Sequence, residues 1–453
     1  MDAEAPRVVI PVSCAPKKAP CPHCGTLGRR KRILTREVRT LAYKTIAILN
    51  VTYGEYAPRC DCCSSFRSNP DGVLPKAKYD NKVRQAVLDR IIDDGLNVES
   101  TLHSLRRDFW LDLSSGFVYD CLRDAAAELD MAQHRQAVLE RFSGVLCVDE
   151  IHLGAFTLLL ATDPVGDFPV AFALVSANDQ EHMERFLRNL QRHGLMPKVV
   201  VTDRSPLYPK LLATLWPDAE HQLCVFHVMQ DINELVLDAV RRLRRKLARR
   251  GERGRRRRRG RPSRAQQQRR RRRGLTVKHK ANFVFKHRYL IVTRRENLSE
   301  KQQKDLATML EYLPELRTLR RFVDTIHRLF ATKQSEQQAW SRWRALQRCA
   351  EYQAIPELAE VLELLSKPQF HKMIAFLRGP AKHRQQVRTN NHVERCNRQL
   401  RFWEKVRYKW RQRRTLVRFV VLALDHWWSR TFSQESATPQ TRARSSKSLA
   451  KAA

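Results

Sequence analysis

The sequence has no run of apolar residues long enough to cross a membrane, and it has far fewer acidic residues than basic ones. A membrane span needs about 20 consecutive apolar residues, so we expect no membrane partner. The first residues, Met-Asp-Ala-Glu-Ala-Pro, lack the basic and apolar regions of a secretory signal. We therefore expect an intracellular protein. No internal repeat period is detectable.

What the chain has in excess is positive charge. It contains 85 Lys and Arg against 47 Asp and Glu, a net charge of +38, in 453 residues of which 42% are apolar. The apolar fraction is enough for folded domains, and the charge favours a polyanionic partner, which inside a cell is usually nucleic acid. Residues 241–273 hold 20 basic residues and one acid. We expect this Arg-rich tract to contact phosphates rather than base edges, unless it is merely solvated.

Six of the 11 cysteines lie within the first 63 residues, and this clustering indicates metal binding. Two short motifs, Cys21-Pro-His-Cys24-Gly25 and Cys60-Asp-Cys62-Cys63, flank alternating β-forming residues between 36 and 56. The pattern predicts a zinc ribbon over residues 21–66, with a structural Zn²⁺ held by four thiolates. The expected ligands are Cys21, Cys24, Cys60 and Cys63, with Cys62 as an alternative to Cys63. Residues 1–20, rich in Pro and Ala, are expected to form a loose arm.

Residues 80–130 predict a helix-turn-helix DNA-binding domain. Apolar residues at helical spacing indicate helices over 82–94, 98–108 and 116–129, the first ending at Gly95 and the second capped by Asn97 or Ser100. The basic side chains expected to meet phosphates are Arg106, Arg107 and Arg123. The alternative interpretation is an ordinary small helical bundle.

From residue 140 to 235 the pattern changes to β-β-β-α-β-α-β. The expected strands cover 145–149, 156–162, 168–176, 198–202 and 221–226, with helices at 179–193 and 207–215. This is the order of the RNase H-like fold, an α/β fold with a mixed five-stranded sheet whose first and fourth strands are adjacent. Beyond it we expect a mostly helical insertion at 236–388, final helices at 389–432 and a disordered tail at 433–453.

Two acidic residues directly follow apolar strands of this predicted sheet. Asp149 ends the first strand and Asp203 ends the fourth, so their carboxylates are expected to converge. Carboxylate oxygens suit Mg²⁺, and a pair of such ions supports phosphoryl transfer. The third acid is expected to be Glu394, at a polar helix start, and not Glu150, which points to the opposite face of its strand. The alternative for Glu394 is a surface ion pair with Arg398.

Several motifs together carry a resemblance. Cys21-Pro-His-Cys24-Gly, the helix-turn-helix pattern, Val148-Asp149-Glu150, Val201-Thr-Asp203-Arg-Ser, Cys224-Val-Phe-His227 and Thr389-Asn-Asn-His-Val-Glu394-Arg-Cys-Asn397 occur in this order. Over about residues 21–430 the chain resembles the bacterial insertion-sequence transposases of the ISL3 type. The resemblance implies an RNase H-like DDE catalytic domain with a helical insertion before the last acid.

The resemblance also implies roles for named residues. Asp149, Asp203 and Glu394 would bind two Mg²⁺ or Mn²⁺ ions, and the enzyme would cleave DNA at the terminal inverted repeats of its element and join the 3′-hydroxyl ends to target DNA. Residues expected to support the site or contact DNA are His227, Asn390, Asn391 and Asn397. A homodimer or higher assembly on double-stranded DNA in the bacterial cytoplasm, associated with the nucleoid, is implied as well.

A second interpretation belongs to another functional class. A zinc-containing DNA-binding regulator would retain an inert RNase H-like scaffold and cleave nothing. The presence of all three acids favours the enzyme, because a protein that only binds DNA has no physical need for them.

Overall fold

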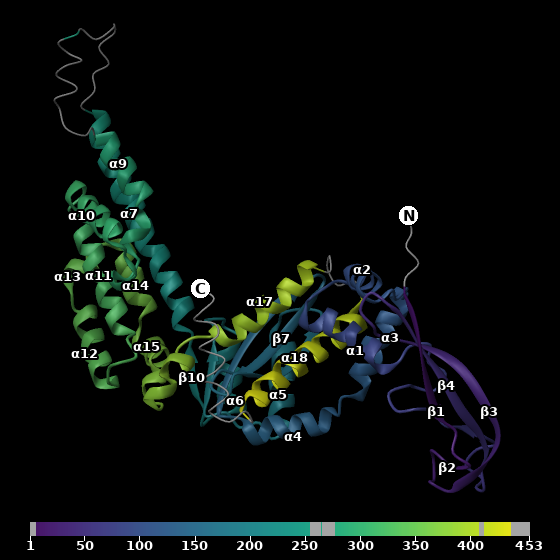
Figure 1. The fold of residues 1–453 in the computed structure, drawn as a ribbon. Helices are drawn as coiled ribbons and strands as arrows, with labels where there is room; N and C mark the ends of the chain where they lie inside the picture. The colour runs from purple at the N-terminus through teal and green to yellow at the C-terminus, as the bar shows by residue number, and fades with distance from the viewer. Residues whose placement is uncertain (1–5, 254–263, 265–276, 407–411, 436–453) are drawn as a thin grey trace. The chain divides into compact units, whose positions relative to one another are not determined.

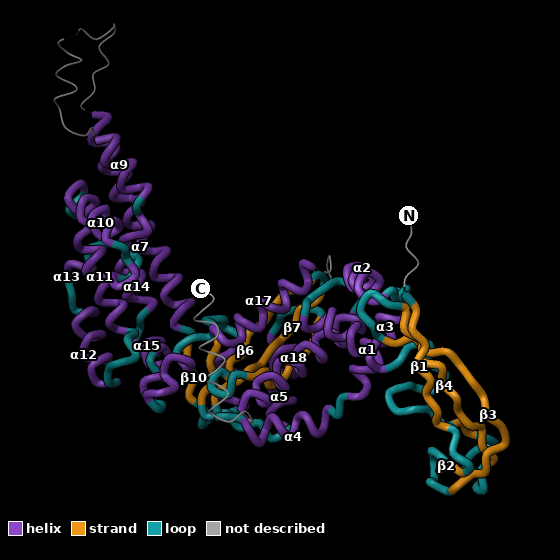
Figure 2. The backbone as a smooth tube through the Cα atoms, in the orientation of Figure 1, coloured by secondary structure: helices purple, strands orange, loops and turns teal. Residues whose placement is uncertain are grey.

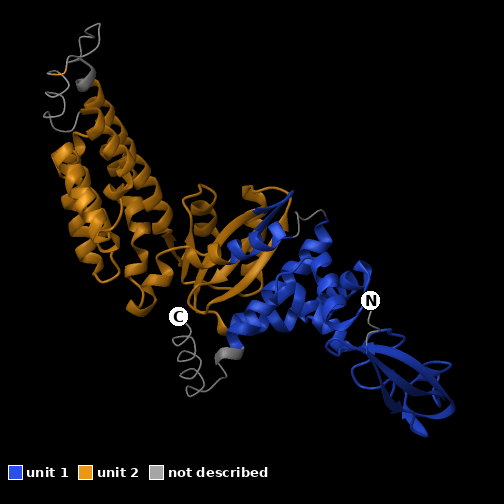
Figure 3. Cartoon of the chain, turned by 45° about the horizontal axis from the view of Figure 1, so that its top comes forward, with its two compact units in different colours: residues 1–140, 152–158, 396–453 blue, residues 141–151, 159–395 orange. Residues whose placement is uncertain are grey.

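The computed structural model describes residues 6–253, 264, 277–406 and 412–435 (Figure 1). The chain divides into two compact units, which Figure 3 shows in different colours. Unit 1 contains residues 1–140, 152–158 and 396–453, and unit 2 contains residues 141–151 and 159–395. Within the described ranges, none of the helices combines the length and apolar character required of a membrane span.

Unit 1 begins with a five-stranded sheet in the order β1-β4-β3-β2, with β5 paired to β4. The two long strands β3 and β4 form an antiparallel hairpin, and β1 pairs with β4 in parallel. Val38 and Val51 of the hairpin pack with Val73 in a small core. The strands are β1 Arg7–Cys14, β2 Lys18–Pro20, β3 Leu27–Thr40, β4 Ile46–Ala57 and β5 Phe66–Arg67.

The expectation of a loose arm over residues 1–20 is wrong for residues 7–20. The run Arg7–Cys14 pairs residue by residue with Ile46–Tyr53 of β4. Its β-branched residues Val8, Val9 and Ile10 favour a strand, and the neighbouring Pro and Ala residues obscured that signal.

The helices of unit 1 agree closely with the helix-turn-helix pattern. The side chains of Asp80, Asn97 and Ser114 cap the starts of α1, α2 and α3. Gly95, with a φ of 71°, ends the first helical segment as expected. That segment changes from α to π geometry in its second half. The helices are α1 Asn81–Leu88, π-helix η1 Asp89–Asp93, α2 Val98–Phe109, α3 Ser115–Glu128 and α4 Met131–Arg141.

The C-terminal helix α18 Arg413–Glu435 packs against α3 and η1 of the same unit. His426 Nε2 lies 3.0 Å from a carboxylate oxygen of Asp93, and the rings of His134 and Trp428 are 5.2 Å apart. The assignment of all residues 389–432 to the catalytic core is therefore wrong for α18. The apolar periodicity of a helix shows that one face is buried but does not show which element covers it.

Unit 2 is built on a five-stranded sheet in the order β10-β9-β6-β7-β8. Figure 2 draws its strands in orange. β6 pairs in parallel with β9, and β9 pairs in parallel with β10, so the first and fourth strands are adjacent as expected. Helix α5 packs against β8 and α6. The elements are β6 Val145–Leu153, β7 Phe156–Asp163, β8 Phe168–Val175, α5 Gln180–Arg192, β9 Val199–Thr202, α6 Tyr208–Leu215 and β10 Glu220–Leu223.

The fifth strand is shorter than expected, because residues 225 and 226 already belong to the long helix α7 Val225–Arg253. The expected boundary between the catalytic core and the helical insertion, at 235/236, therefore falls inside a continuous helix. One apolar face continues across this boundary, and its buried residues are Val228, Ile232, Val236 and Val240.

The described part of the segment after α7 is mostly helical, as expected, with short loops such as residues 331–335 between its helices. Helices α9, α11 and α14 pack against α7. These helices are α9 Val277–Lys286, η2 Arg288–Ile291, η3 Arg295–Asn297, α10 Glu300–Tyr312, α11 Leu316–Leu329, α12 Glu336–Gln347, α13 Ala350–Gln353, α14 Pro356–Leu364, α15 Lys367–Met373, η4 Ala375–Leu377, η5 Ala381–His383, α16 Arg384–Val387 and α17 Asn391–Val406.

A buried carboxylate holds the β7–β8 turn of unit 2. Asp163 is fully buried, and its oxygens accept hydrogen bonds from the backbone N–H groups of Ser143, Val165 and Gly166 and from the Ser143 hydroxyl, at 2.7–2.9 Å. One side chain thus satisfies four donors, which fixes both the turn and the entry to β6.

Replacing Asp163 with Ala should lower the free energy of unfolding by about 3 kcal/mol, because buried donors lose their acceptor. The measurement is denaturant unfolding of the full chain. Asp218→Ala is the matched control, since Asp218 is exposed and has no side-chain partner among the described residues, and it should change stability by less than about 0.5 kcal/mol. Equal effects of the two substitutions would refute the role of Asp163.

Candidate functional site

Asp149 lies within β6, which continues to Leu153, so the expectation that Asp149 ends its strand is wrong; Asp203 directly follows β9. The parallel register pairs Val145 with Val199 and Cys147 with Val201. Continued by two residues, the same register would bring Asp149 beside Asp203. Paired residues of adjacent parallel strands project to the same face of the sheet, so this register supports the expectation that the two side chains converge.

The electrostatics of Asp149 are those of a crowded acidic site. Burial is the largest cause that raises the pKa of Asp149, and the carboxylates of Glu150, Asp203 and Glu394 also raise it, to about 7 in all. Like charges this close are unfavourable unless a cation or a proton compensates them. Asp203 and Glu394 therefore lie within electrostatic range of Asp149.

Glu394 lies in the first turn of α17, close to His227 in the first turn of α7. The distance from His227 Nε2 to Glu394 Oε1 is 3.7 Å. A hydrogen bond with Cys224 is the largest cause that raises the pKa of His227, and the carboxylates of Glu394 and Asp203 also raise it, to about 9 in all, against the opposing effect of burial. His227 therefore supplies a positive charge beside the acids. In the part of the chain that the structure describes, Glu394 forms no ion pair with Arg398.

Asn390 connects the end of β6 to Cys224 rather than facing solvent. It is fully buried, its Nδ2 donates to the Val148 carbonyl at 3.3 Å, and its backbone N–H donates to Cys224 Sγ at 3.2 Å. These bonds hold the residue before α17 next to the strand that carries Asp149, and its burial excludes direct DNA contact. Asn391 is exposed and Asn397 is buried on α17, three residues beyond Glu394.

Glu150 has partners of its own. Its two carboxylate oxygens accept hydrogen bonds from Asn178 Nδ2 at 2.8 Å and from the Tyr208 hydroxyl at 3.2 Å. Burial raises the pKa of Tyr208, and the nearby acids Glu150, Asp203 and Asp149 raise it further, so this hydroxyl stays protonated and donates. Glu150 is thus bonded to residues next to α5 and within α6.

A further contact that the sequence did not indicate fixes the start of α17. His392 is buried, its Nε2 lies 2.9 Å from Asp167 Oδ1, and Arg395 forms an ion pair with the same carboxylate. Asp167 sits in the β7–β8 turn with a φ of 58°. Its pKa is held below the usual value by the bond from His392 and the charge of Arg395, despite partial burial. The sequence Asp167-Phe-Pro gives no signal that predicts a positive φ at Asp167.

The cysteine cluster of unit 1 contains Cys21, Cys24 and Cys60 as expected, but its fourth member is Cys62. One Sγ from each of these four residues lies within 4.8 Å of the others. Cys63 lies outside this group of four, although its Sγ is 3.9 Å from that of Cys21. Both Cys60 and Cys63 pack against the apolar residues around Tyr56 and Phe66. The grouping of the sulfurs therefore favours Cys62, the expected alternative to Cys63, as the fourth ligand.

The first cysteine motif has the geometry of a metal-binding turn. Gly25 has a φ of 76°, and its N–H donates to the Cys21 carbonyl at 2.9 Å. Hydrogen bonds from the side chain and backbone of Thr26 lower the pKa of Cys24 to about 6, which favours the thiolate, the form that binds zinc. The four sulfurs are therefore compatible with a structural Zn²⁺.

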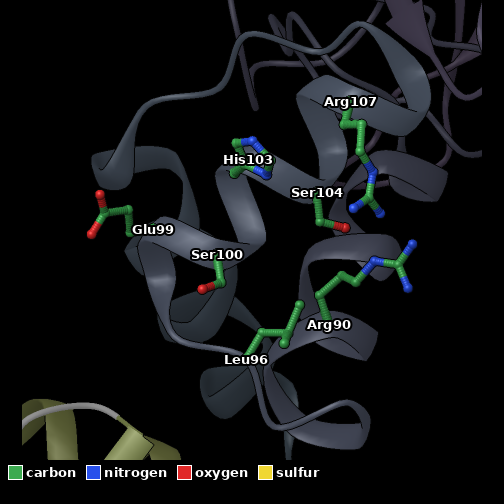
Figure 4. Close-up of a pocket in the computed structure, with 7 residues that line it drawn as sticks. All are labelled: Arg90, Leu96, Glu99, Ser100, His103, Ser104 and Arg107. Atoms are coloured by element: carbon green, nitrogen blue, oxygen red, sulfur yellow. The ribbon is translucent and has the colours of Figure 1, made fainter.

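The basic residues of α2 and α3 differ in whether an acidic side chain pairs with them. Arg107 forms an ion pair with Asp108, and Arg123 forms ion pairs with Asp120 and Asp124. Arg106 is exposed and has no acidic partner among the described residues. A shallow pocket lies against α2, and Figure 4 shows the residues that line it: Arg90, Leu96, Glu99, Ser100, His103, Ser104 and Arg107.

Comparison with known proteins places the chain in a family. A family model described as a transposase, of the ISL3 DDE type, matches residues 146–416, which is more than half of the chain. The chain belongs to this transposase family. No curated protein matches. The structure is also similar to the Drosophila P element transposase in its strand transfer complex, with a TM-score of 0.37 and 14% identity over 76% of this chain and 91% of that chain.

The region matched by the transposase family contains the Arg-rich tract, of which residues 254–263 and 265–273 lie outside the described residues. The described start of the tract has structural contacts. Arg242 of α7 binds both carboxylate oxygens of Glu357, at 2.6 and 2.8 Å, and the Arg244 guanidinium lies 5.0 Å from the ring centre of Phe285. At these two positions the tract joins α7 to neighbouring helices of this transposase.

The cysteine cluster of this transposase predicts that substitutions of the adjacent residues Cys62 and Cys63 differ in their effect on zinc binding. Cys62→Ser should lose about one bound zinc per chain and destabilise the sheet of unit 1, because a structural site needs all four ligands. Cys63→Ser should retain the metal. Metal analysis of the purified full-length variants decides the matter, and zinc loss from Cys63→Ser alone would reverse the assignment.

Proposed function

We propose that this transposase is a metal-dependent DNA strand-transfer enzyme with an RNase H-like catalytic domain in unit 2. Its catalytic acids are Asp149, Asp203 and Glu394. The observation that carries the proposal is the parallel pairing of β6 with β9, whose register brings Asp149 toward Asp203. Burial and the neighbouring carboxylates together raise the pKa of Asp149 to about 7. The strand order β10-β9-β6-β7-β8 supports the RNase H-like assignment.

The donor set fits hard divalent cations. Three carboxylates in electrostatic range leave an excess of negative charge that a single imidazolium, that of His227, does not balance. Oxygen ligands of this kind suit two Mg²⁺ or Mn²⁺ ions, which when bound activate the attacking oxygen and stabilise the leaving oxygen of a phosphoryl transfer. Asp149, Asp203 and Glu394 would hold them.

The proposed reaction has two steps. Water attacks the phosphodiester at each end of the element, the bond to the 3′-oxygen breaks, and a free 3′-hydroxyl remains. That hydroxyl then attacks a phosphodiester of the target DNA, where a new bond forms and the old 3′-oxygen leaves. The chain's own residues position the acids for both steps: Asn390 fixes the end of β6, and His227 and the Asp167–His392 pair fix the start of α17.

We further propose that unit 1 recognises the DNA ends. The zinc ribbon, held by a structural Zn²⁺, and the helix-turn-helix formed by α2 and α3 would contact the terminal inverted repeats, with Arg106, Arg107 and Arg123 meeting phosphates. Unit 2 would act on the ends and on target DNA, in a homodimer or higher assembly. The free charge of Arg106 makes it the strongest of the three phosphate contacts.

Glu394→Gln should reduce metal-dependent cleavage of DNA that contains the element ends by about 100-fold or more, because it removes a charge that the reaction needs. DNA binding should survive. Glu150→Gln is the matched control, because Glu150 bonds Asn178 and Tyr208, and it should retain most activity. Normal cleavage by Glu394→Gln, or by Asp149→Ala, would contradict the proposed triad. A wild type that binds DNA but does not cleave it would instead favour a DNA-binding protein without catalysis.

The Arg-rich tract should act through phosphates. Changing Arg255 to Arg259 to Gln should weaken binding to all DNA sequences alike and reduce the slope of log affinity against log salt by up to about 4, because fewer counterions are released. Arg242→Gln serves as the comparison and should instead lower stability through the lost Glu357 pair. A change in sequence preference at an unchanged salt slope would argue against phosphate contact.

A further inference from the structure

Three side chains of different chemistry meet beside the proposed catalytic acids of unit 2. Cys224 immediately precedes α7, His227 lies in the first turn of α7, and Glu394 lies in the first turn of α17. One potential ligand atom from each lies within 4.8 Å of the others. The sequence shows the Cys-x-x-His pair, but only the fold adds the carboxylate, 167 residues further along the chain.

This donor set differs from that of the paired aspartates. A thiolate and an imidazole are ligands that Zn²⁺ prefers and Mg²⁺ avoids, and Zn²⁺ also accepts carboxylate oxygen. Three protein ligands leave the fourth tetrahedral position to water or another group. Donor atoms around a tetrahedral Zn²⁺ lie about 3.5 Å apart, so small side-chain rotations bring the three groups to the metal.

Two polar atoms of the cluster have unmet bonding capacity. His227 Nδ1 and Glu394 Oε1 are buried and have no hydrogen-bond partner among the described residues. Burying such atoms without a partner is unfavourable. A bound Zn²⁺ would replace the proton of the His227 imidazolium and accept a lone pair from that ring and another from Glu394.

Cys224 is held in place by a contact of its own. The backbone N–H of Asn390 donates to its Sγ at 3.2 Å, and Cys224 directly precedes the 29-residue helix α7. Hydrogen bonds to a ligand from outside the metal shell orient and stabilise it.

We propose that Cys224, His227 and Glu394 form a second zinc site, distinct from the cysteine cluster of unit 1, and that Zn²⁺ bound there inhibits DNA cleavage. Inhibition follows because Glu394 is drawn into coordination with Zn²⁺ and no longer serves the proposed Mg²⁺ site. The binding half of the proposal stands on the cluster alone, and the inhibitory half rests on the proposed function.

Cobalt is a suitable probe of the binding half, because Co²⁺ replaces Zn²⁺ at such sites and a thiolate ligand gives it a charge-transfer absorption. The metal-free full-length protein should bind two Co²⁺ per chain with this absorption. Cys224→Ser and His227→Asn should each bind one, and Cys62→Ser should bind one that still shows it. A single Co²⁺ in the wild type, lost entirely in Cys62→Ser, would overturn the proposal. So would two thiolate-bound Co²⁺ in both Cys224→Ser and His227→Asn.

The inhibitory half is tested by adding Zn²⁺ to cleavage reactions run in excess Mg²⁺, with each variant compared with its own zinc-free rate. Half-inhibition of Cys224→Ser should need at least about 10-fold more Zn²⁺ than the wild type. Cys349→Ser, at a partly buried cysteine elsewhere in unit 2, is the matched control and should respond like the wild type. Equal inhibition of wild type and Cys224→Ser would refute this half.

The two proposals fail in different ways. If the wild type does not cleave DNA with Mg²⁺, the proposed function fails while the cobalt count of the second site stays valid. If the wild type cleaves DNA but binds one Co²⁺, only the second site is refuted.

Discussion

The parallel pairing of β6 with β9 is the constraint on which the rest of unit 2 depends. Without it, Asp149 and Asp203 would end unrelated strands, and neither would experience the other's charge. The pairing is driven by ordinary forces, because both strands are apolar and buried and their backbone groups need partners. The free energy gained by burying these two strands thus offsets the repulsion between the carboxylates that they bring together.

The elements around the pair stabilise this unfavourable arrangement from several sides. Asn390 bonds Val148 beside Asp149, the Asp167–His392 pair fixes the first turn of α17, and Asp163 fixes the β7–β8 turn. The first two contacts join residues far apart in the sequence, and the third is local. Such contacts hold the elements of the site in place, which is what a reaction controlled by positioning requires.

Much of this organisation follows from the sequence, because it rests on local signals. The caps at Asp80, Asn97 and Ser114 set helix starts. The apolar run before Asp149 starts the strand that contains it, and the run before Asp203 forms the strand that it follows. What the sequence could not provide is a choice between partners with equal local signals. Cys62 and Cys63 are adjacent residues of the same type, and only the positions of their sulfurs in the fold separate them. Likewise, the apolar face of α18 gives no sign that α3 covers it.

Unit 1 is built from segments far apart in the sequence, and this affects the order in which its parts can pack during synthesis. Its N-terminal helices are complete by residue 141, but the helix that packs on α3 begins at Arg413. At about 5–20 residues per second, a ribosome needs roughly 15–55 s to make the intervening residues. For that time the face of α3 that α18 covers has no partner, whereas unit 2 can complete its sheet as soon as β10 emerges. Emergence of α18, rather than emergence of the N-terminal helices, therefore governs when unit 1 can complete its packing.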